Sequence, residues 1–343
     1  MNLQPTPSRF LSRRLALAAA LACGTLLTAC GGGGGDTTTP PPVTTLSQPD
    51  ATADSVNASD TGNDTAASMD SVVDTTAALA QAIGQQAGAS AAGRRQAQSA
   101  TPVNTLTIDC AGGGTAAVLV SGTTALDVYD GQLDAGEHYS VTYTQCTGKA
   151  GWTQLNGSVE MDVTAADYGT SPATLAVSLT VTSLAVSTPH GSATLDGTAT
   201  VSRSVVVANG TTTTTSHVTV PSATLATAYN ARSATFTLSN LDATCTVASV
   251  AGITTASQYS GSHTLSGTAD GRTFSYSVST TGNVNYDATG ALASGAWTVV
   301  RPDATIATTV ADGTVIITVD DGSNGSIDHT WTFPTAQLNA AAG

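Results

Sequence analysis

Apolar and polar residues alternate along most of the chain from about Thr105 onward. Between Leu175 and Thr182 every second residue is Leu or Val, and between Phe274 and Ser279 aromatic residues and Val alternate with Ser. A period of two is typical of a β-strand with one buried face. The pattern predicts roughly fourteen strands without an intervening helix, at 115–121, 138–146, 153–164, 173–187, 192–207, 212–227, 233–246, 257–268, 274–279, 283–288, 295–300, 304–310, 314–319 and 328–333.

This succession of strands predicts a mainly β domain over residues 101–337, followed by a tail at 338–343. Strands that follow one another without helices favour an antiparallel sandwich, a barrel or one large curled sheet. The apolar phase slips near Ser183, and a β-bulge there would keep the core on one side of the strand.

A short motif of Leu, then Asn, Asp or Ser, then Gly recurs at 155–157, 195–197 and 265–267. The unequal spacing of the three copies argues against a solenoid. A glycine inside or beside a strand is typical of a sharp bend, so the motif predicts bends in long, curled strands.

Residues 68–100 are predicted to hold one short helix and a linker. Their apolar residues fall on a single helical stripe, and Ser71 with Asp74 resembles a capping box. The stripe is too weak to stand alone, so a helix here would pack against the β domain. The alternative is an Ala-rich continuation of the preceding linker. The stripe consists of Val72, Thr76, Leu79, Ala80, Ile83 and Ala87.

Residues 1–29 have the three parts of an export signal peptide. Arginines at positions 9, 13 and 14 precede an apolar stretch, and small residues lead to Cys30. Leu27–Cys30 is similar to the lipobox of bacterial lipoproteins, whose cysteine carries acyl chains such as palmitate after cleavage. The resemblance implies lipidation of Cys30, which anchors the chain to a membrane. Gly31 in place of Asp implies the outer membrane, with the domain facing the periplasm or the cell surface.

Residues 30–67 are predicted to be a disordered linker that begins with the lipidated cysteine. Five glycines (31–35) are followed by a Thr-rich and Pro-rich stretch, which is typical of a tether. A linker of this length would lift the domain clear of the lipid headgroups.

The charge balance restricts the partners. The chain has 10 Lys and Arg against 24 Asp and Glu, and three of the arginines lie in the predicted signal, so the mature protein has 7 basic residues and a formal charge of −17. Such a surface repels nucleic acid and anionic headgroups. Attachment to the membrane is therefore expected to depend on the acyl chains. With nucleic acid excluded, the expected partner is a hydrophobic ligand or an unidentified cell-envelope protein.

Three cysteines remain after Cys23 and Cys30, and an exported protein can form disulfides. Cys110 and Cys146 end two predicted strands, so they would meet if these strands pair. Cys245 is then a free thiol, or it replaces one partner of the pair. The absence of Cys-x-x-Cys and of Cys/His ligand spacing argues against zinc.

Residues 110–157 resemble a group of uncharacterised proteobacterial lipoproteins. The shared pattern is Cys-x-Gly-Gly at Cys110, an acidic glycine turn at 130–137, a second cysteine at Cys146 and Leu-Asn-Gly at 155–157. The resemblance implies a common architecture and supports the Cys110–Cys146 pair. It implies no activity.

Two acidic turns are candidates for calcium. Asp320, Asn324 and Asp328 fall at positions one, five and nine of a calcium loop with glycine at position six, but Trp331 replaces the glutamate of position twelve. In the other turn, Asp130, Asp134 and Glu137 fall at five, nine and twelve, while Leu126 and Val128 occupy positions one and three. Each turn is half a site, and the alternative is an ordinary hairpin loop.

The sequence contains no HExxH, GxSxG or phosphate-loop motif. We therefore expect a non-enzymatic display or interaction domain with no cofactor other than calcium at the two turns. The alternative is a carrier that holds a lipid or another hydrophobic ligand inside a curled sheet.

Overall fold

The computed structural model describes residues 45–89, 104–110, 112–122, 131–147, 154–188, 191–229, 232–269 and 272–341. Cys30, Asp130 and the predicted signal lie outside these residues. The described part contains one antiparallel sheet of 15 strands, which are β1 (Asn104–Asp109), β2 (Thr115–Ser121), β3 (His138–Thr147), β4 (Gln154–Asp167), β5 (Ala173–Thr188), β6 (Gly191–Ala208), β7 (Thr211–Tyr229), β8 (Arg232–Val250), β9 (Ile253–Ala269), β10 (Arg272–Thr280), β11 (Val284–Tyr286), β12 (Leu292–Val300), β13 (Ala304–Ala311), β14 (Thr314–Asp321) and β15 (His329–Pro334).

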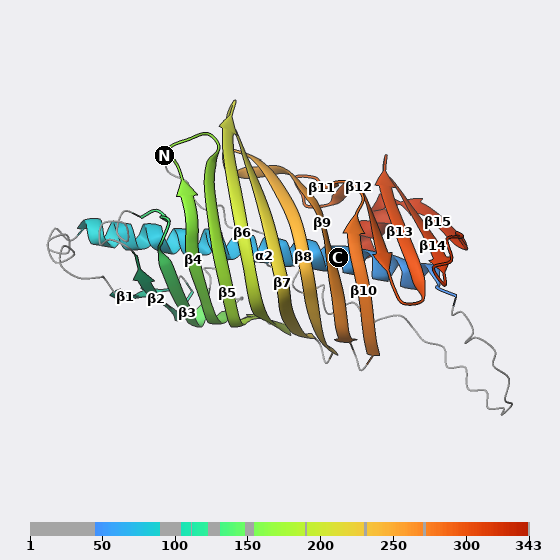
Figure 1. Ribbon diagram of the computed structural model, residues 1–343, viewed down its shortest axis with the longest axis horizontal. Coiled ribbons are helices and arrows are strands. Elements are labelled where there is room, and N and C mark those ends of the chain that lie inside the picture. Colours follow the sequence, from blue (N-terminus) through green and yellow to red (C-terminus); the bar gives the residue numbers. More distant parts are fainter. Residues whose placement is uncertain are drawn as a thin grey trace.

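The sheet is a meander in which almost every strand pairs with the strands before and after it in the sequence. The exception is the short β11, which pairs with β9 and β12 beside the main path. The path runs from β1 to β15 without returning, so the sheet is open at both edges. The prediction of a mainly β, antiparallel fold is confirmed. Of the three expected forms, a sandwich, a barrel or one curled sheet, the chain adopts the single curled sheet (Figure 1).

The two faces of the sheet differ in composition, as the period of two requires. One face, here called the inner face, is apolar and buried, with Tyr139, Met161, Leu179, Val201 and Val218 among its residues. On the opposite, outer face the side chains are mainly Ser and Thr. A row of outer residues in cross-strand register extends from β2 to β15, and consists of Ser121, His138, Asp162, Ser178, Thr200, Thr219, Asp242, Ser262, Ser279, Thr298, Ala307, Thr318 and Thr330.

Bulges bend the long strands, and the bulge expected near Ser183 is confirmed. The register between β5 and β6 shifts between Val181 and Leu184, and Ser183 has a φ of 47°. The backbone N–H of Ser183 donates to Asp196 Oδ1 at 2.6 Å. The Leu-Asp-Gly motif therefore supplies the carboxylate that holds this bulge, and its glycine, Gly197, approaches Ala223 too closely for a side chain.

The Leu-Asn-Gly copy of the motif does the same between β3 and β4. Here the register shifts between Tyr143 and Cys146, and Gln145 has a φ of 48°. The N–H of Gln145 donates to Asn156 Oδ1 at 2.8 Å. Because each bulge adds local twist and bend, these two copies of the motif help to curl the sheet.

The largest difference from the sequence prediction is the helix α2 (Gln48–Ala89), which has 42 residues. Its first 20 residues, 48–67, fall inside the predicted linker, so the expectation of a short helix after a disordered 30–67 linker is wrong over 48–67. Its first turn is capped by Ser47, because Asp50 N–H lies 3.4 Å from Ser47 Oγ and Ala51 N–H donates to Ser47 O at 2.9 Å. Ser71, the predicted cap, lies in the middle of the helix.

Helix α2 lies against the inner face and crosses the strands along the length of the sheet (Figure 1). It contacts the strands from β6 to β10 and from β12 to β14. Most of its described buried residues recur at intervals of three, four or seven, as expected of one helix face. These are Ala51, Ser55, Gly62, Ala66, Met69, Val73, Thr76, Ala80 and Ile83, and Val56 and Thr61 beside this row are also buried.

A second helix, α4 (Thr335–Ala341), follows β15. Leu338 in this helix is buried in the core at 1% exposure. The prediction that a tail begins at residue 338 is therefore wrong for 338–341.

The disulfide between Cys110 and Cys146 is confirmed, with Cα atoms 5.4 Å apart. It joins the end of β1 to the end of β3, which are both neighbours of β2. Cys245 is a free, partly buried thiol.

Candidate functional site

The interface between α2 and the inner face is the most elaborate polar arrangement in the described part of the chain. At its centre the helix backbone approaches β9 closely. A Cβ atom at Gly62 would lie 2.4 Å from His263 Cε1 and 2.7 Å from Tyr259 Oη. Both side chains are buried, so only glycine fits at this crossing.

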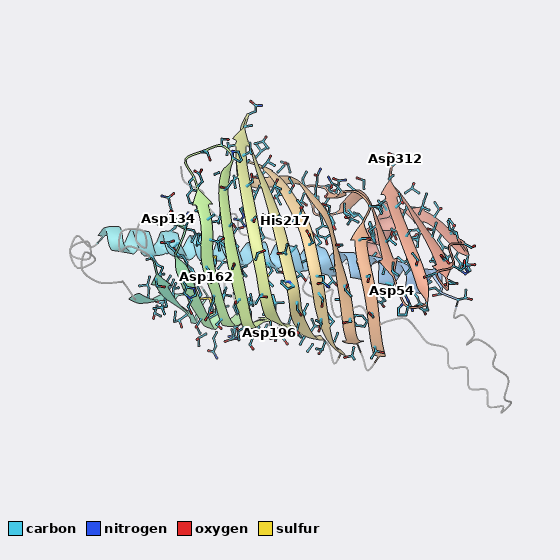
Figure 2. The ribbon with its side chains drawn as sticks, viewed as in Figure 1. Asp54, Asp134, Asp162, Asp196, His217 and Asp312 are labelled. Carbon is cyan, nitrogen blue, oxygen red and sulfur yellow. A yellow bond between two sulfur atoms is a disulfide. The ribbon has the colours of Figure 1, made fainter. Side chains whose placement is uncertain are left out.

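The first polar anchor of α2 lies near its N-terminus, where Figure 2 shows Asp54 beside the strands. The carboxylate of Asp54 accepts hydrogen bonds from Arg301 and, at 3.0 Å, from Tyr276 Oη. Trp297 Nε1 donates to Ser55 Oγ at 2.9 Å, and Ser55 Oγ lies 2.5 Å from Thr308 Oγ1. One turn of the helix is therefore held by residues of β10, β12 and β13. Arg301, in the turn between β12 and β13, is part of the same anchor.

The second anchor holds the middle of α2 to β6. Arg203 contacts the carboxylates of Asp70 and Asp74 at 2.6 and 2.5 Å. It also donates to the backbone carbonyl of Asp70 at 3.1 Å. Only 12% of the Arg203 side chain is exposed, so the guanidinium depends on these partners.

Burial and pairing oppose each other in the electrostatics of these anchors. Burial raises the pKa of Asp54, although the nearby Arg301 and the hydrogen bond from Tyr276 lower it. Burial alone would lower the pKa of Arg203, but Asp70 and Asp74 raise it, and the raising effect is larger. Arg203 is therefore held in its charged form.

Titratable side chains near the helix are poorly suited to nucleophilic chemistry. Burial, and to a lesser extent the charge of Asp70, raises the pKa of Cys245 to about 12, which keeps it a thiol at neutral pH. His263 is 3% exposed and lies beneath Gly62. On the outer face, His138 and His217 lie 2.7 and 2.8 Å from single aspartates and are solvent-accessible.

The predicted calcium loop at 320–328 is a hairpin loop whose polar side chains bind its own backbone. Asp320 accepts hydrogen bonds from the N–H groups of Asn324 and Gly325 at 2.9 and 2.7 Å. Asn324 Oδ1 accepts one from Ser326, and Asp328 Oδ2 accepts one from Asp321 at 2.8 Å. These bonds account for the residue types without a metal ion.

The second acidic turn follows the same principle over its described residues, 131–137. Glu137 is 2% exposed, and its Oε2 accepts hydrogen bonds at 2.8 Å from both Asp134 N–H and Tyr139 Oη. Asp130 lies outside the described residues. In the part of the chain that the structure describes, no three His, Cys, Asp or Glu residues form a group that could hold a metal ion.

Sequence reasoning missed the residues of the α2 interface. Asp54, Asp70 and Arg203 are isolated charges in the sequence, and nothing in their local pattern connects them. The available signal was the Ser47-Gln-Pro-Asp50 start, which combines a capping residue, a proline in the first turn and an acidic residue.

Comparisons with protein-family models, curated proteins and solved structures found no match to this chain. The resemblance to proteobacterial lipoproteins is therefore a prediction. None of the helices in the described residues has the length and apolar character needed to span a membrane.

Replacing Gly62 by valine should weaken the packing of α2 against the sheet, because the new side chain would overlap His263 and Tyr259. We expect the free energy of unfolding to fall by at least about 2 kcal/mol, the range of an overpacked core. Ala67→Val, at an exposed position of the same helix, should cost only about 0.5 kcal/mol through helix propensity. Urea unfolding measures both, and equal losses would show that Gly62 does not limit the approach of the helix.

Replacing Arg203 by methionine should leave the partly buried Asp70 carboxylate without its cation. We expect a loss of about 3 kcal/mol in the free energy of unfolding. Adding Asp70→Leu should recover part of this loss, because an apolar pair can replace a buried ion pair at little cost. A double-mutant cycle measures the coupling, with Asp162→Asn on the outer face as a control. Additive effects of the two substitutions would contradict the anchor.

Proposed function

We propose that this protein is an outer-membrane lipoprotein whose β domain is a non-enzymatic display and interaction module. The observation that carries the proposal is the Leu27–Cys30 motif at the end of an apolar stretch with a basic start. A cysteine in this context is the site of lipidation, and its acyl chains supply a stable membrane anchor.

The arrangement of the domain supports an interaction role. Helix α2 covers much of the inner face, so the surfaces most open to a protein partner are the outer face, the edge strands and the hairpin ends. The outer face carries short hydroxyl side chains in register over many strands, with single carboxylates at Asp162 and Asp242. Such a surface suits weak polar contacts with a cell-envelope partner better than the assembly of a catalytic site.

The anchor is tested by replacing Cys30 with serine in the full chain. The wild-type protein should partition into the detergent phase of Triton X-114 and incorporate labelled palmitate, because its acyl chains are apolar. The Cys30→Ser variant should lose both properties. Cys23→Ser, in the apolar part of the same signal, is the matched control and should behave as wild type. A Cys30→Ser protein that still takes up palmitate would contradict the proposal.

A second candidate function is the transport of a lipid or another hydrophobic ligand. The observation that favours it is a strip of inner-face residues that lie opposite one another on β5 to β8 and on β10. Apart from Phe236, these residues are only partly buried. A strip across this many strands is long enough for an acyl chain, since neighbouring strands are about 4.8 Å apart. The strip consists of Leu184, Leu195, Leu225, Phe236 and Phe274.

Native mass spectrometry of the protein purified from membranes tests this function. A carrier should retain a non-covalent lipid, and Leu225→Asp should abolish the retained mass because it places a charge in the strip. Thr224→Asp, at the adjacent exposed position, should leave it unchanged. A wild-type protein whose mass includes only the chain and its covalent acyl groups would rule out the carrier.

A further inference from the structure

The ends of two neighbouring hairpins carry the largest group of exposed aliphatic side chains in the described part of the chain. The β6–β7 hairpin exposes Val206 and Val207 by 37% and 50%, and the β8–β9 hairpin exposes Val250 and Ile253 by 46% and 71%. The two ends are adjacent, because Thr211 of β7 pairs with Val250 of β8. We call residues 204–216 and 243–258 the tip pair.

The tip pair is free of charge in a strongly acidic protein. Neither segment contains Asp, Glu, Lys, Arg or His, whereas the chain as a whole has 24 acidic residues. Other turns at the same end of the strands do carry carboxylates, including Asp167 before the β4–β5 turn and Asp312 between β13 and β14. Figure 2 shows Asp312 at this end of the strands. The combination of exposed valine and isoleucine with no charge is therefore specific to the tip pair.

The β6–β7 hairpin projects, and both hairpins of the tip pair are built on tight turns. The end of β6 is the highest point of the sheet in Figure 1. Asn209 and Gly210 have φ of 50° and 75°, and Ala251 and Gly252 have φ of 50° and 78°. Two successive positive φ values define the two-residue turn that best fits twisted strands. The aliphatic side chains are thus presented on short turns rather than on long loops.

We propose that the tip pair inserts into the surface of the lipid bilayer to which Cys30 anchors the protein. Four aliphatic side chains are too few for a stable protein–protein interface, which buries more than about 1,000 Å². They suffice as a second, weak membrane contact, because the acyl anchor raises the effective concentration of the domain at the bilayer. The absence of charge removes the repulsion that anionic headgroups exert on the rest of the surface.

The start of α2 at Gln48 makes this contact geometrically accessible. Only the 17 residues from Gly31 to Ser47 separate Cys30 from the helix, rather than the 37 that a linker ending at 67 would provide. Their fully extended length is at most about 60 Å. The domain is therefore confined to the neighbourhood of the membrane. This inference rests on the proposed lipid anchor, and its test separates the two.

The test uses the full lipidated protein bound to vesicles of phosphatidylethanolamine and phosphatidylglycerol (3:1) that contain lipids brominated on their acyl chains. Ile253→Trp places an indole at the tip pair, and Ile327→Trp, in the β14–β15 turn with 65% exposure, is the matched control. We expect the bromolipids to quench the added fluorescence at least twofold for Ile253→Trp and to leave that of Ile327→Trp unchanged. Val207→Asp, combined with Ile253→Trp, should remove the quenching.

Flotation of the same vesicles distinguishes the ways in which the proposal can fail. If the protein floats with the vesicles and neither added indole is quenched, the tip inference is overturned while the anchor stands. Equal quenching at both positions would also overturn it, because the contact would not be specific to the tip pair. If the protein does not float at all, the anchor fails and the tip inference fails with it.

Discussion

The fold depends on one constraint: an open sheet with an apolar face must cover that face. A closed barrel does this with its own strands, and a sandwich does it with a second sheet. Here β1 and β15 do not meet, and a single helix lies along the inner face instead. The bulges held by Asn156 and Asp196 help to curl the sheet around that helix. Removing α2 would expose the inner faces of the strands that it crosses.

The helix itself depends on the sheet in return. Its buried face is built largely from Ala, Ser, Gly and Thr, and its sequence is rich in residues with low helix propensity. Small residues allow the close approach seen at Gly62, but they bury little apolar surface. The polar anchors at Asp54 and Arg203 fix the position of the helix along the sheet, because paired charges tolerate little displacement. Helix and sheet therefore specify each other.

The alternation of apolar and polar residues was sufficient to predict most of the sheet. Each strand buries one face, so its own sequence alternates. It also located the bulge at Ser183, and the ends of two strands indicated the Cys110–Cys146 pair. The first half of α2 was not predicted because its buried positions are mostly small or polar and form no apolar stripe; they are Ala51, Ser55, Thr61 and Gly62, with Val56 beside them. The sequence alone does not separate the two interpretations of the acidic turns, because carboxylates at calcium-loop spacing also suit a loop that binds its own N–H groups. Contacts such as Asp70 with Arg203 join residues 133 apart, and no local pattern records them.

The position of α2 also changes how the predicted anchor would act. A linker ending at residue 67 would allow the domain to move far from the membrane, and its acidic surface would favour that separation. With the helix beginning at Gln48, the proposed anchor would keep the domain and the bilayer within a shorter range, and the surface nearest the bilayer would gain importance. The two hairpins of the tip pair lack the carboxylates that other hairpins at the same end of the strands carry, which suits them to a surface that excludes charge. A lipid surface meets this description and would lie within reach of the proposed anchor, so the two proposals, lipidation of Cys30 and insertion of the tip pair, describe two parts of one membrane attachment.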